Sequence, residues 1–257
     1  MSNIAFLWDS QHRSAAWAAS SAKSTLPASN LGTDEMGAEW QTAEGVDEAY
    51  VVADVGSDLP VSVMALLNLA CSSAASFTFK VSNSDPTGLA GEVYSSLPFY
   101  QFDPTWRHLV HVLPSQVMGR YRRIEISDPG AARIAAACMP QGAFWQPAHN
   151  VEYGVALGFE DDDQRTYTRG GVEYIDAAAQ RRVLRARLPA LTAEDHSDQL
   201  MPMARHAARR RPILAILNPA ATVFGFNSIW GRIRSPLEFP AAFHAHYAWS
   251  FEISETL

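Results

Sequence analysis

The sequence is poor in cysteine and lysine and contains no long apolar run. Its 257 residues include only two cysteines, Cys71 and Cys138, too few for a disulfide framework and too far apart for a Cys-x-x-Cys site. Both lie in apolar stretches, so we expect buried, unreactive thiols. No apolar run approaches the ~20 residues that cross a bilayer, and the first residues lack the charged and apolar regions of a secretory leader. We therefore expect synthesis in the cytoplasm and no membrane insertion.

The charge balance argues against nucleic acid as a partner. The chain carries 20 lysines and arginines against 27 acidic residues, a formal net charge of -7, and neither half of it is basic. Surfaces that bind nucleic acid have the opposite sign. All but two of the basic residues are arginine, whose planar guanidinium pairs carboxylates through two hydrogen bonds and is enriched at interfaces. A GC-rich genome gives the same bias.

Motifs of the common enzyme classes are missing as well. The sequence contains no Gly-x-Ser-x-Gly elbow, no glycine-rich phosphate-binding loop and no His-Glu-x-x-His. The acidic run Glu160–Asp163 lacks the alternating spacing of a calcium loop and is typical of a solvated turn. A hydrolase using Asp161 and Asp163 as an acid pair stays open as an alternative, and His244 with His246 lacks a third metal ligand. We expect no catalysis, no metal and no cofactor.

Alternation with a period of two dominates the pattern and predicts strands. It is clearest from Phe243 to Ile253, where aromatic and aliphatic residues alternate with smaller or polar ones, as in a half-buried strand. Many short strands separated by Gly, Pro, Asn and Asp indicate a mainly β protein built on an antiparallel β-sandwich. Other strands are expected at 49–55, 61–69, 77–81, 107–113, 121–127, 133–139, 153–159, 182–188, 213–217 and 223–233.

One helix is expected near residues 193–210. Thr192 and Asp195 have the spacing of a capping box, and the apolar residues that follow share one face. Pro202 is expected to kink or break this helix. The three arginines 209–211 are typical of a cationic helix C-terminus.

Several short motifs follow one another in a characteristic order. Asn30-Leu31 precedes Trp40 and the segment Ala53–Gly56, and the arginine-rich strand Tyr121–Ile126 leads into a Ser-Asp-Pro turn. This order resembles the galactose-binding-like (discoidin-type) jelly rolls of tailed-phage structural proteins. The resemblance implies that residues 1–147 form a galactose-binding-like β-sandwich.

The second half is similar to phage tail and baseplate proteins in looser patterns. Arg169-Gly170-Gly171 is typical of a hairpin turn, and a strand at Trp230–Arg232 precedes a closing strand at Tyr247–Glu252. The resemblance implies that residues 148–257 form a second, β-rich assembly domain that carries the helix. No sugar-binding or metal-binding residue of the carbohydrate-binding jelly rolls has a match in this sequence.

The resemblance implies a structural component of a phage tail tip or baseplate, made in the host cytoplasm and built into the tail of the virion. Its partners would be other tail and baseplate proteins around the tail hub, with further copies of the chain in a ring. Arginines that share a strand or follow the helix are the candidate interface residues, and an ordinary charged outer surface is the alternative. They are Arg181, Arg182, Arg185, Arg187, Arg209, Arg210 and Arg211.

Carbohydrate binding is the alternative function. Trp106 and Trp145 lie beside proline-containing loops, which favours their exposure, whereas large aromatic residues elsewhere are expected in the core. Exposed aromatic rings can stack on sugar rings. A module that recognises a host-surface glycan through Trp106 and Trp145 therefore stays open.

Overall fold

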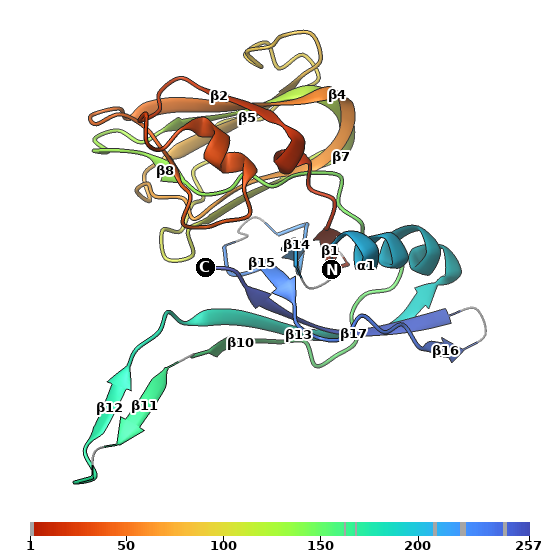
Figure 1. The fold of residues 1–257 in the computed structure, drawn as a ribbon. Helices are drawn as coiled ribbons and strands as arrows, with labels where there is room; N and C mark the ends of the chain where they lie inside the picture. The colour runs from red at the N-terminus through yellow and green to blue at the C-terminus, as the bar shows by residue number, and fades with distance from the viewer. Residues whose placement is uncertain (1–2, 162, 168, 208–209, 222–224, 244–245) are drawn as a thin grey trace. The chain divides into compact units, whose positions relative to one another are not determined.

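The chain divides into two compact units, which are described separately. The computed structural model describes residues 3–161, 163–167, 169–207, 210–221, 225–243 and 246–257 (Figure 1). The first unit contains the residues up to Pro147 together with Ile213–Ser228, and the second contains Ala148–Pro212 with Ile229–Leu257. The chain therefore returns to the first unit after the helix, which the simple division at residue 147 does not include.

The first unit is an antiparallel β-sandwich. Its strands are β1 (Ala5–Leu7), β2 (Ala16–Ala19), β3 (Trp40–Gln41), β4 (Glu48–Leu67), β5 (Ser76–Ser82), β6 (Tyr94–Ser95), β7 (His108–Ser127), β8 (Ala135–Ala136), β9 (Gln141–Gly142) and β14 (Ile213–Ile216), with 3-10 turns η1 (Gln11–Ser14) and η2 (Ala28–Gly32). The larger sheet has the order β2-β4-β7-β5-β6, with β9 added to β4, and β3 pairs with β8. Strand β14 pairs with β1 and places Ile216 opposite Ala5.

Strands β4 and β7 are each 20 residues long and pair along most of their length. The sequence predicts two shorter strands in place of each. In β4 the register shifts between Asp54 and Leu59, where Asp54 Oδ1 accepts a hydrogen bond from Gly56 N–H at 2.8 Å and Gly56 has a φ of 85°. These turn residues form an irregularity inside one long strand rather than ending it.

Alternation along β5 and β7 separates the core from the outer face of the larger sheet. Phe77 and Phe79 of β5 pack in the core with Ile124 and Ile126 of β7, and Trp40 is fully buried beside them. Successive side chains of a strand point to opposite faces, so the residues between these apolar positions lie on the outer face. That face carries the candidate site.

The second unit is also built on antiparallel strands. They are β10 (Ala156–Glu160), β11 (Gln164–Tyr167), β12 (Glu173–Asp176), β13 (Arg181–Thr192), β15 (Ser228–Ile233), β16 (Ala241–Phe243) and β17 (His246–Glu255). The order β15-β17-β13-β10 forms its main sheet, β16 pairs with β17, and β11 pairs with β12. Trp230 and Trp249 are fully buried. The predicted C-terminal strand is confirmed only from His246 onward, in β17, where Trp249, Phe251 and Ile253 alternate with the less buried Ser250 and Glu252. The prediction that this strand begins at Phe243 is wrong, because Phe243 ends β16, which pairs with β17.

The expected helix begins as the π-helical segment η3 (Asp195–Leu200) and continues as α1 (Met201–His206). The predicted capping box is confirmed, because Asp195 N–H donates to Thr192 Oγ1 at 3.0 Å and Thr192 N–H donates to Asp195 Oδ2 at 3.2 Å. Pro202 lies in the first turn of α1, where its missing N–H is tolerated. It therefore coincides with the change from π to α geometry and does not end the helix.

Helix α1 ends earlier than expected, at His206. Arg210 and Arg211 lie beyond it, where Arg210 N–H donates to the Ala207 carbonyl, and Arg209 lies outside the described residues. Arg210 and Arg211 therefore follow the helix instead of forming its last turn. None of the helices in the described part of the chain is long and apolar enough to cross a membrane.

Candidate functional site

Strand register builds a polar grid on the outer face of the larger sheet. Strand β7 lies between β4 and β5, so each outward residue of β7 has a neighbour on either side. Two successive rows across β4, β7 and β5 are Tyr50, Glu125 and Thr78, followed by Glu48, Ser127 and Ser76. Six polar side chains that are far apart in the sequence therefore share one surface.

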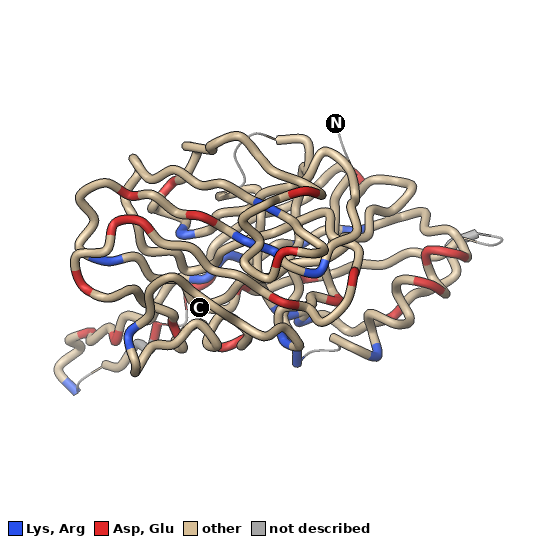
Figure 2. The backbone as a smooth tube through the Cα atoms, turned by 90° about the horizontal axis from the view of Figure 1, so that it is seen from above, with Lys and Arg blue, Asp and Glu red and all other residues tan. Residues whose placement is uncertain are grey.

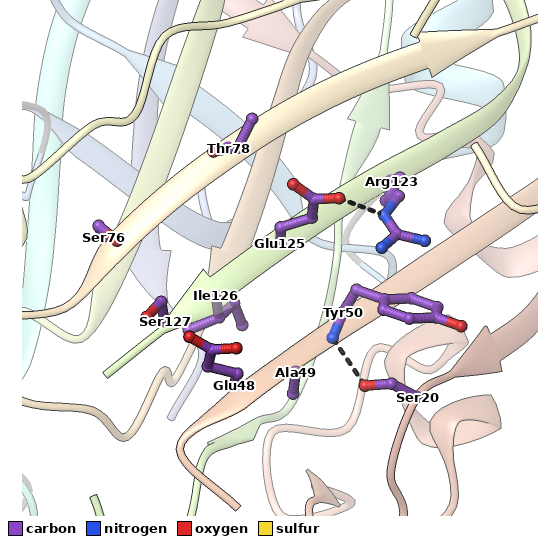
Figure 3. Close-up of a pocket in the computed structure, with 10 residues that line it drawn as sticks. All are labelled: Ser20, Glu48, Ala49, Tyr50, Ser76, Thr78, Arg123, Glu125, Ile126 and Ser127. Carbon is purple, nitrogen blue, oxygen red and sulfur yellow. Dashed lines mark hydrogen bonds and ion pairs between the residues drawn. The ribbon is translucent and has the colours of Figure 1, made fainter. Parts of the chain in front are cut away.

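Arg123 holds one end of this grid in place (Figure 3). Its guanidinium carbon lies 3.5 Å from the centroid of the Tyr50 ring, a cation–π contact. Its Nε donates to Glu125 Oε1 at 2.8 Å and its Nη1 donates to the Thr87 carbonyl at 3.0 Å. Lys80 Nζ donates to the same oxygen of Glu125 at 2.9 Å. Because Arg123 is only 7% exposed, these contacts preorganise Tyr50 and Glu125.

The grid borders a hollow of about 440 Å³ in the first unit. At its edge, Ser20 Oγ accepts a hydrogen bond from Tyr50 N–H at 2.9 Å and anchors this part of β4. The side-chain oxygens of several other lining residues have no hydrogen-bond partner within the described residues. They belong to Glu48, Tyr50, Ser76, Thr78 and Ser127. The hollow therefore offers donors and acceptors that the fold does not use.

The two tryptophans predicted as a glycan platform do not line this hollow. Trp145 is 9% exposed, and its ring stacks on Phe6 with the centroids 5.6 Å apart. The prediction that Trp145 is exposed is wrong, because its backbone also pairs with Phe6 of β1 and holds the ring against that residue. Trp106 is half-buried and packs on Gly225, where an added Cβ would lie 2.9 Å from the indole Cδ1.

The candidate interface arginines of β13 differ in exposure. Arg185 and Arg187 are exposed on one face, as expected. Arg185 pairs with Glu160 and, through its Nε at 2.8 Å, with Glu252, so it is tied within its own sheet. Arg187 lies 3.5 Å from Glu152.

The prediction that Arg182 is an interface residue is wrong. It is 3% exposed, and its Nε donates to Glu255 Oε1 at 2.9 Å. A buried guanidinium paired in this way is part of the core of the second unit. Arg181 is half-buried, and Arg210 and Arg211 are exposed.

A Ser-His-Asp chain in the first unit is structural. His12 Nδ1 lies 2.7 Å from Ser10 Oγ, and His12 Nε2 lies 3.1 Å from Asp34 Oδ1. Ser10 and His12 are buried, and Ser10 Oγ accepts a hydrogen bond from Gln141 N–H at 3.0 Å. A nucleophile needs access to substrate, which the buried Ser10 does not have. These hydrogen bonds therefore join the N-terminal segment to β9.

The remaining residues considered for chemistry do not converge. Glu160 ends β10 and pairs with arginines, and no group of three His, Cys, Asp or Glu among the described residues could hold a metal ion. His244 lies outside the described residues. Cys71 and Cys138 are free thiols. Burial, followed by the charge of Asp128, raises the pKa of Cys71 to about 12, as expected for an unreactive thiol.

Sequence reasoning missed the residues of the hollow. The alternation in 49–55 and 121–127 puts Tyr50 and Arg123 on the polar side of their strands. Only the register of β4, β7 and β5 brings the two rows together, and register between distant strands has no local signal. The missed set is therefore visible as outward-facing residues but not as a site.

Comparison with known proteins leaves the family open. No protein-family model and no curated protein matches the chain. Chitosan-binding module 1 of a Paenibacillus sp. IK-5 chitosanase/glucanase is 20% identical, with 52% of this chain and 98% of that one covered and a TM-score of 0.41. The family 32 CBM of C. perfringens NanJ, solved with galactose, is 11% identical, with 51% and 95% covered and a TM-score of 0.42. A Streptococcus pneumoniae fucose binding module is 12% identical, with 53% and 99% covered and a TM-score of 0.41. Likeness at this level assigns no ligand to this chain.

Proposed function

We propose that the first unit is a non-catalytic module that binds neutral glycans in the hollow on the outer face of its larger sheet. The observation that carries this proposal is the set of polar groups that line the hollow and have no partner within the described residues. Sugars present many hydroxyl groups, each of which both donates and accepts hydrogen bonds. A concave surface with several fixed polar groups suits such a ligand.

The charges around the hollow favour a neutral glycan over an anionic one. Glu48 is exposed, and Glu125 has a second oxygen, Oε2, in addition to the one held by Lys80 and Arg123. Carboxylate oxygens accept strong hydrogen bonds from hydroxyl groups. They repel the carboxylates of uronic and sialic acids. The guanidinium of Arg123 is already directed at Tyr50, Glu125 and Thr87.

Isothermal titration with a panel of neutral oligosaccharides of glucose, galactose and N-acetylglucosamine, and with polygalacturonate, tests the proposal. We expect a neutral member to bind and polygalacturonate not to bind. Glu48→Gln should weaken binding about tenfold, since a hydrogen bond to a charged group is worth about 1.5 kcal/mol or more. Tyr50→Phe should weaken binding about threefold to tenfold, since a neutral hydrogen bond is worth about 0.5–1.5 kcal/mol. Glu44→Gln is the matched control, because Glu44 is an exposed glutamate of the same unit that does not line the hollow.

Two results would contradict this site. Binding that survives both substitutions in the hollow but is lost in Trp106→Ala would move the site to Trp106. No binding of any neutral glycan by the folded chain would remove glycan binding as the function.

Assembly into a larger particle is a second candidate function, and the β11–β12 ribbon favours it. Tyr167, Tyr174 and Ile175 of this ribbon are exposed, and among the described residues its two strands pair only with each other. Exposed apolar side chains of this kind are typical of interaction surfaces. In a phage tail or baseplate, which the sequence resembles, such a ribbon would contact neighbouring proteins. A complete tail assembled without this chain would contradict that role.

A further inference from the structure

We call residues 161–180 of the second unit, of which the structure describes all but 162 and 168, the arm; the described part consists of the β11–β12 ribbon and its flanking residues (Figure 1). Within the described chain, β11 and β12 pair only with each other, and every residue from Gly171 to Gln180 is exposed. Its exposed apolar side chains are Tyr167, Val172, Tyr174 and Ile175. A two-stranded ribbon alone gains little stability in water, so the arm needs a surface to pack on.

The arm is acidic. Its sequence contains five acidic and two basic residues, and Figure 2 shows acidic residues along it. Asp161 and Asp176 are exposed and have no ion-pair partner in the described part of the chain. The surface that covers the arm should therefore be basic.

A basic hollow of about 550 Å³ lies in the same unit, and we call it the arginine hollow. Its lining includes Arg181, Arg232 and Arg234, together with residues 254–257. Arg232 is exposed, and no carboxylate of the described residues lies within ion-pair distance of it. Arg234 lies 3.0 Å from Glu160.

Arg232 gives the arginine hollow a positive charge that is not offset, because Glu160 pairs with Arg234 and the one glutamate that lines the hollow is already neutralised. Glu255 is paired with the buried Arg182, whose Nε lies 2.9 Å from Glu255 Oε1. The hollow also adjoins the arm, since Arg181 directly follows the arm and stands opposite Glu160 at its root. An acidic arm and a basic hollow thus share one end of the unit's sheet.

We propose that the arm docks in the arginine hollow of a second copy of this chain, while the arm of that copy docks in return. The β11–β12 ribbon leads away from β10 and β13 of its own sheet (Figure 1). A two-fold axis beside the shared end gives each arm the hollow of the other copy, a contact of the isologous kind. Strand β11 alone, from Gln164 to Tyr167, spans about 10 Å.

The contact combines charge with apolar burial. Asp161 and Asp176 supply carboxylates that accept paired hydrogen bonds from the guanidinium of Arg232. The rings of Tyr167 and Tyr174 provide flat faces for guanidinium groups. This dimer uses only the second unit, so it stands or falls independently of glycan binding by the first.

Sedimentation velocity of the full chain between 1 and 100 µM measures the association. We expect a species of twice the 28.2 kDa chain mass that dissociates in 1 M NaCl, because salt screens exposed ion pairs. Arg232→Glu should weaken the dimer at least tenfold. Arg133→Glu is the matched control, because Arg133 is an exposed arginine of the first unit, and it should leave the dimer unchanged.

A charge swap separates docking from misfolding. The arm-reversed variant Asp161→Arg/Asp176→Arg and the hollow-reversed variant Arg232→Glu should each be monomeric alone. Mixed in equal amounts they should form a heterodimer, because one contact pairs the two reversed surfaces and the other pairs the two native ones. Unchanged circular dichroism of each variant shows that both are folded.

A chain that is monomeric at 100 µM in low salt would overturn the proposal and leave a different protein as the arm's partner. A dimer that persists unchanged in Arg232→Glu, or reversed variants that do not associate when mixed, would also overturn it.

Discussion

The first unit should lose stability as the pH falls below 6.5, because its fold holds His111 in the neutral form. Its ring stacks on Phe79 with the centroids 4.3 Å apart and the planes 11° from parallel. Its Nε2 lies 2.7 Å from the Tyr94 hydroxyl oxygen. Burial lowers the pKa of His111 from 6.5 to about 4, because the imidazolium would lose its hydration between these rings.

The magnitude follows from proton linkage. An unfolded chain binds a proton at this position below pH 6.5, whereas the folded chain binds one only near pH 4. A tenfold change in proton affinity corresponds to about 1.4 kcal/mol. The free energy of unfolding should therefore fall by about 3 kcal/mol through His111 alone as the pH falls from above 6.5 to below 4, and this loss should level off once the pH is well below 4.

The test compares the wild type with His111→Gln, which cannot gain this proton. The variant should be less stable at pH 7 because it loses the stacking on Phe79. The stability difference, measured by urea denaturation, should shrink by about 3 kcal/mol as the pH falls to 4. His149→Gln, at an exposed position, is the control and should show no such narrowing. A constant difference across this pH range, or an NMR titration of His111 centred near 6.5, would refute the reasoning.

Two further substitutions test the packing and the electrostatics. Burial acts to raise the pKa of Asp34, but hydrogen bonds from His12 and Arg13 outweigh it and hold that pKa at about 2. Because Asp34 is partly exposed and solvent screens these contacts, Asp34→Asn should remove about 1 kcal/mol of stability that the wild type has above pH 4 and loses as the pH falls toward 2; equal denaturation midpoints at pH 6 would contradict this. Gly231→Ala should cost about 1–3 kcal/mol, because its Cβ would lie 2.2 Å from the Ser254 carbonyl oxygen, whereas Gly158→Ala meets nothing within 4 Å; similar thermal midpoints for the two variants would contradict the close approach.

The local features of the fold could be predicted from the sequence. The C-terminal alternation and the capping box of Thr192 and Asp195 each depend on neighbouring residues, and both are confirmed. The mainly β class with one helical region is confirmed in the same way, because strand periodicity recurs along the whole chain.

Features that depend on distant pairing could not be predicted. The return of Ile213–Ser228 to the first unit follows from the pairing of β14 with β1, which are separated by about 200 residues. The burial of Trp145 follows from its contact with Phe6, and that of Arg182 from its pairing with Glu255. In each case the partner lies far away in the sequence, and local composition suggests exposure.

The candidate site also depends on the pairing of strands that are distant in the sequence. Tyr50, Arg123 and Glu125 look like ordinary outward residues of their strands, and no motif connects them. Their surface exists because β7 lies between β4 and β5 in one particular register. Trp106 and Trp145 stood out by residue type and by the proline-containing loops beside them, and neither feature shows which distant residues their rings contact.

Chemical-shift mapping by NMR tests glycan binding in the hollow most directly. A neutral oligosaccharide added to isotopically labelled protein should perturb the backbone amides of Glu48–Tyr50, Ser76–Thr78 and Arg123–Ser127 together, in a saturable way. It should leave the amides around Trp106 unchanged. Perturbations that gather around Trp106, or no saturable perturbation with any neutral glycan of the panel, would contradict the site proposed for the first unit.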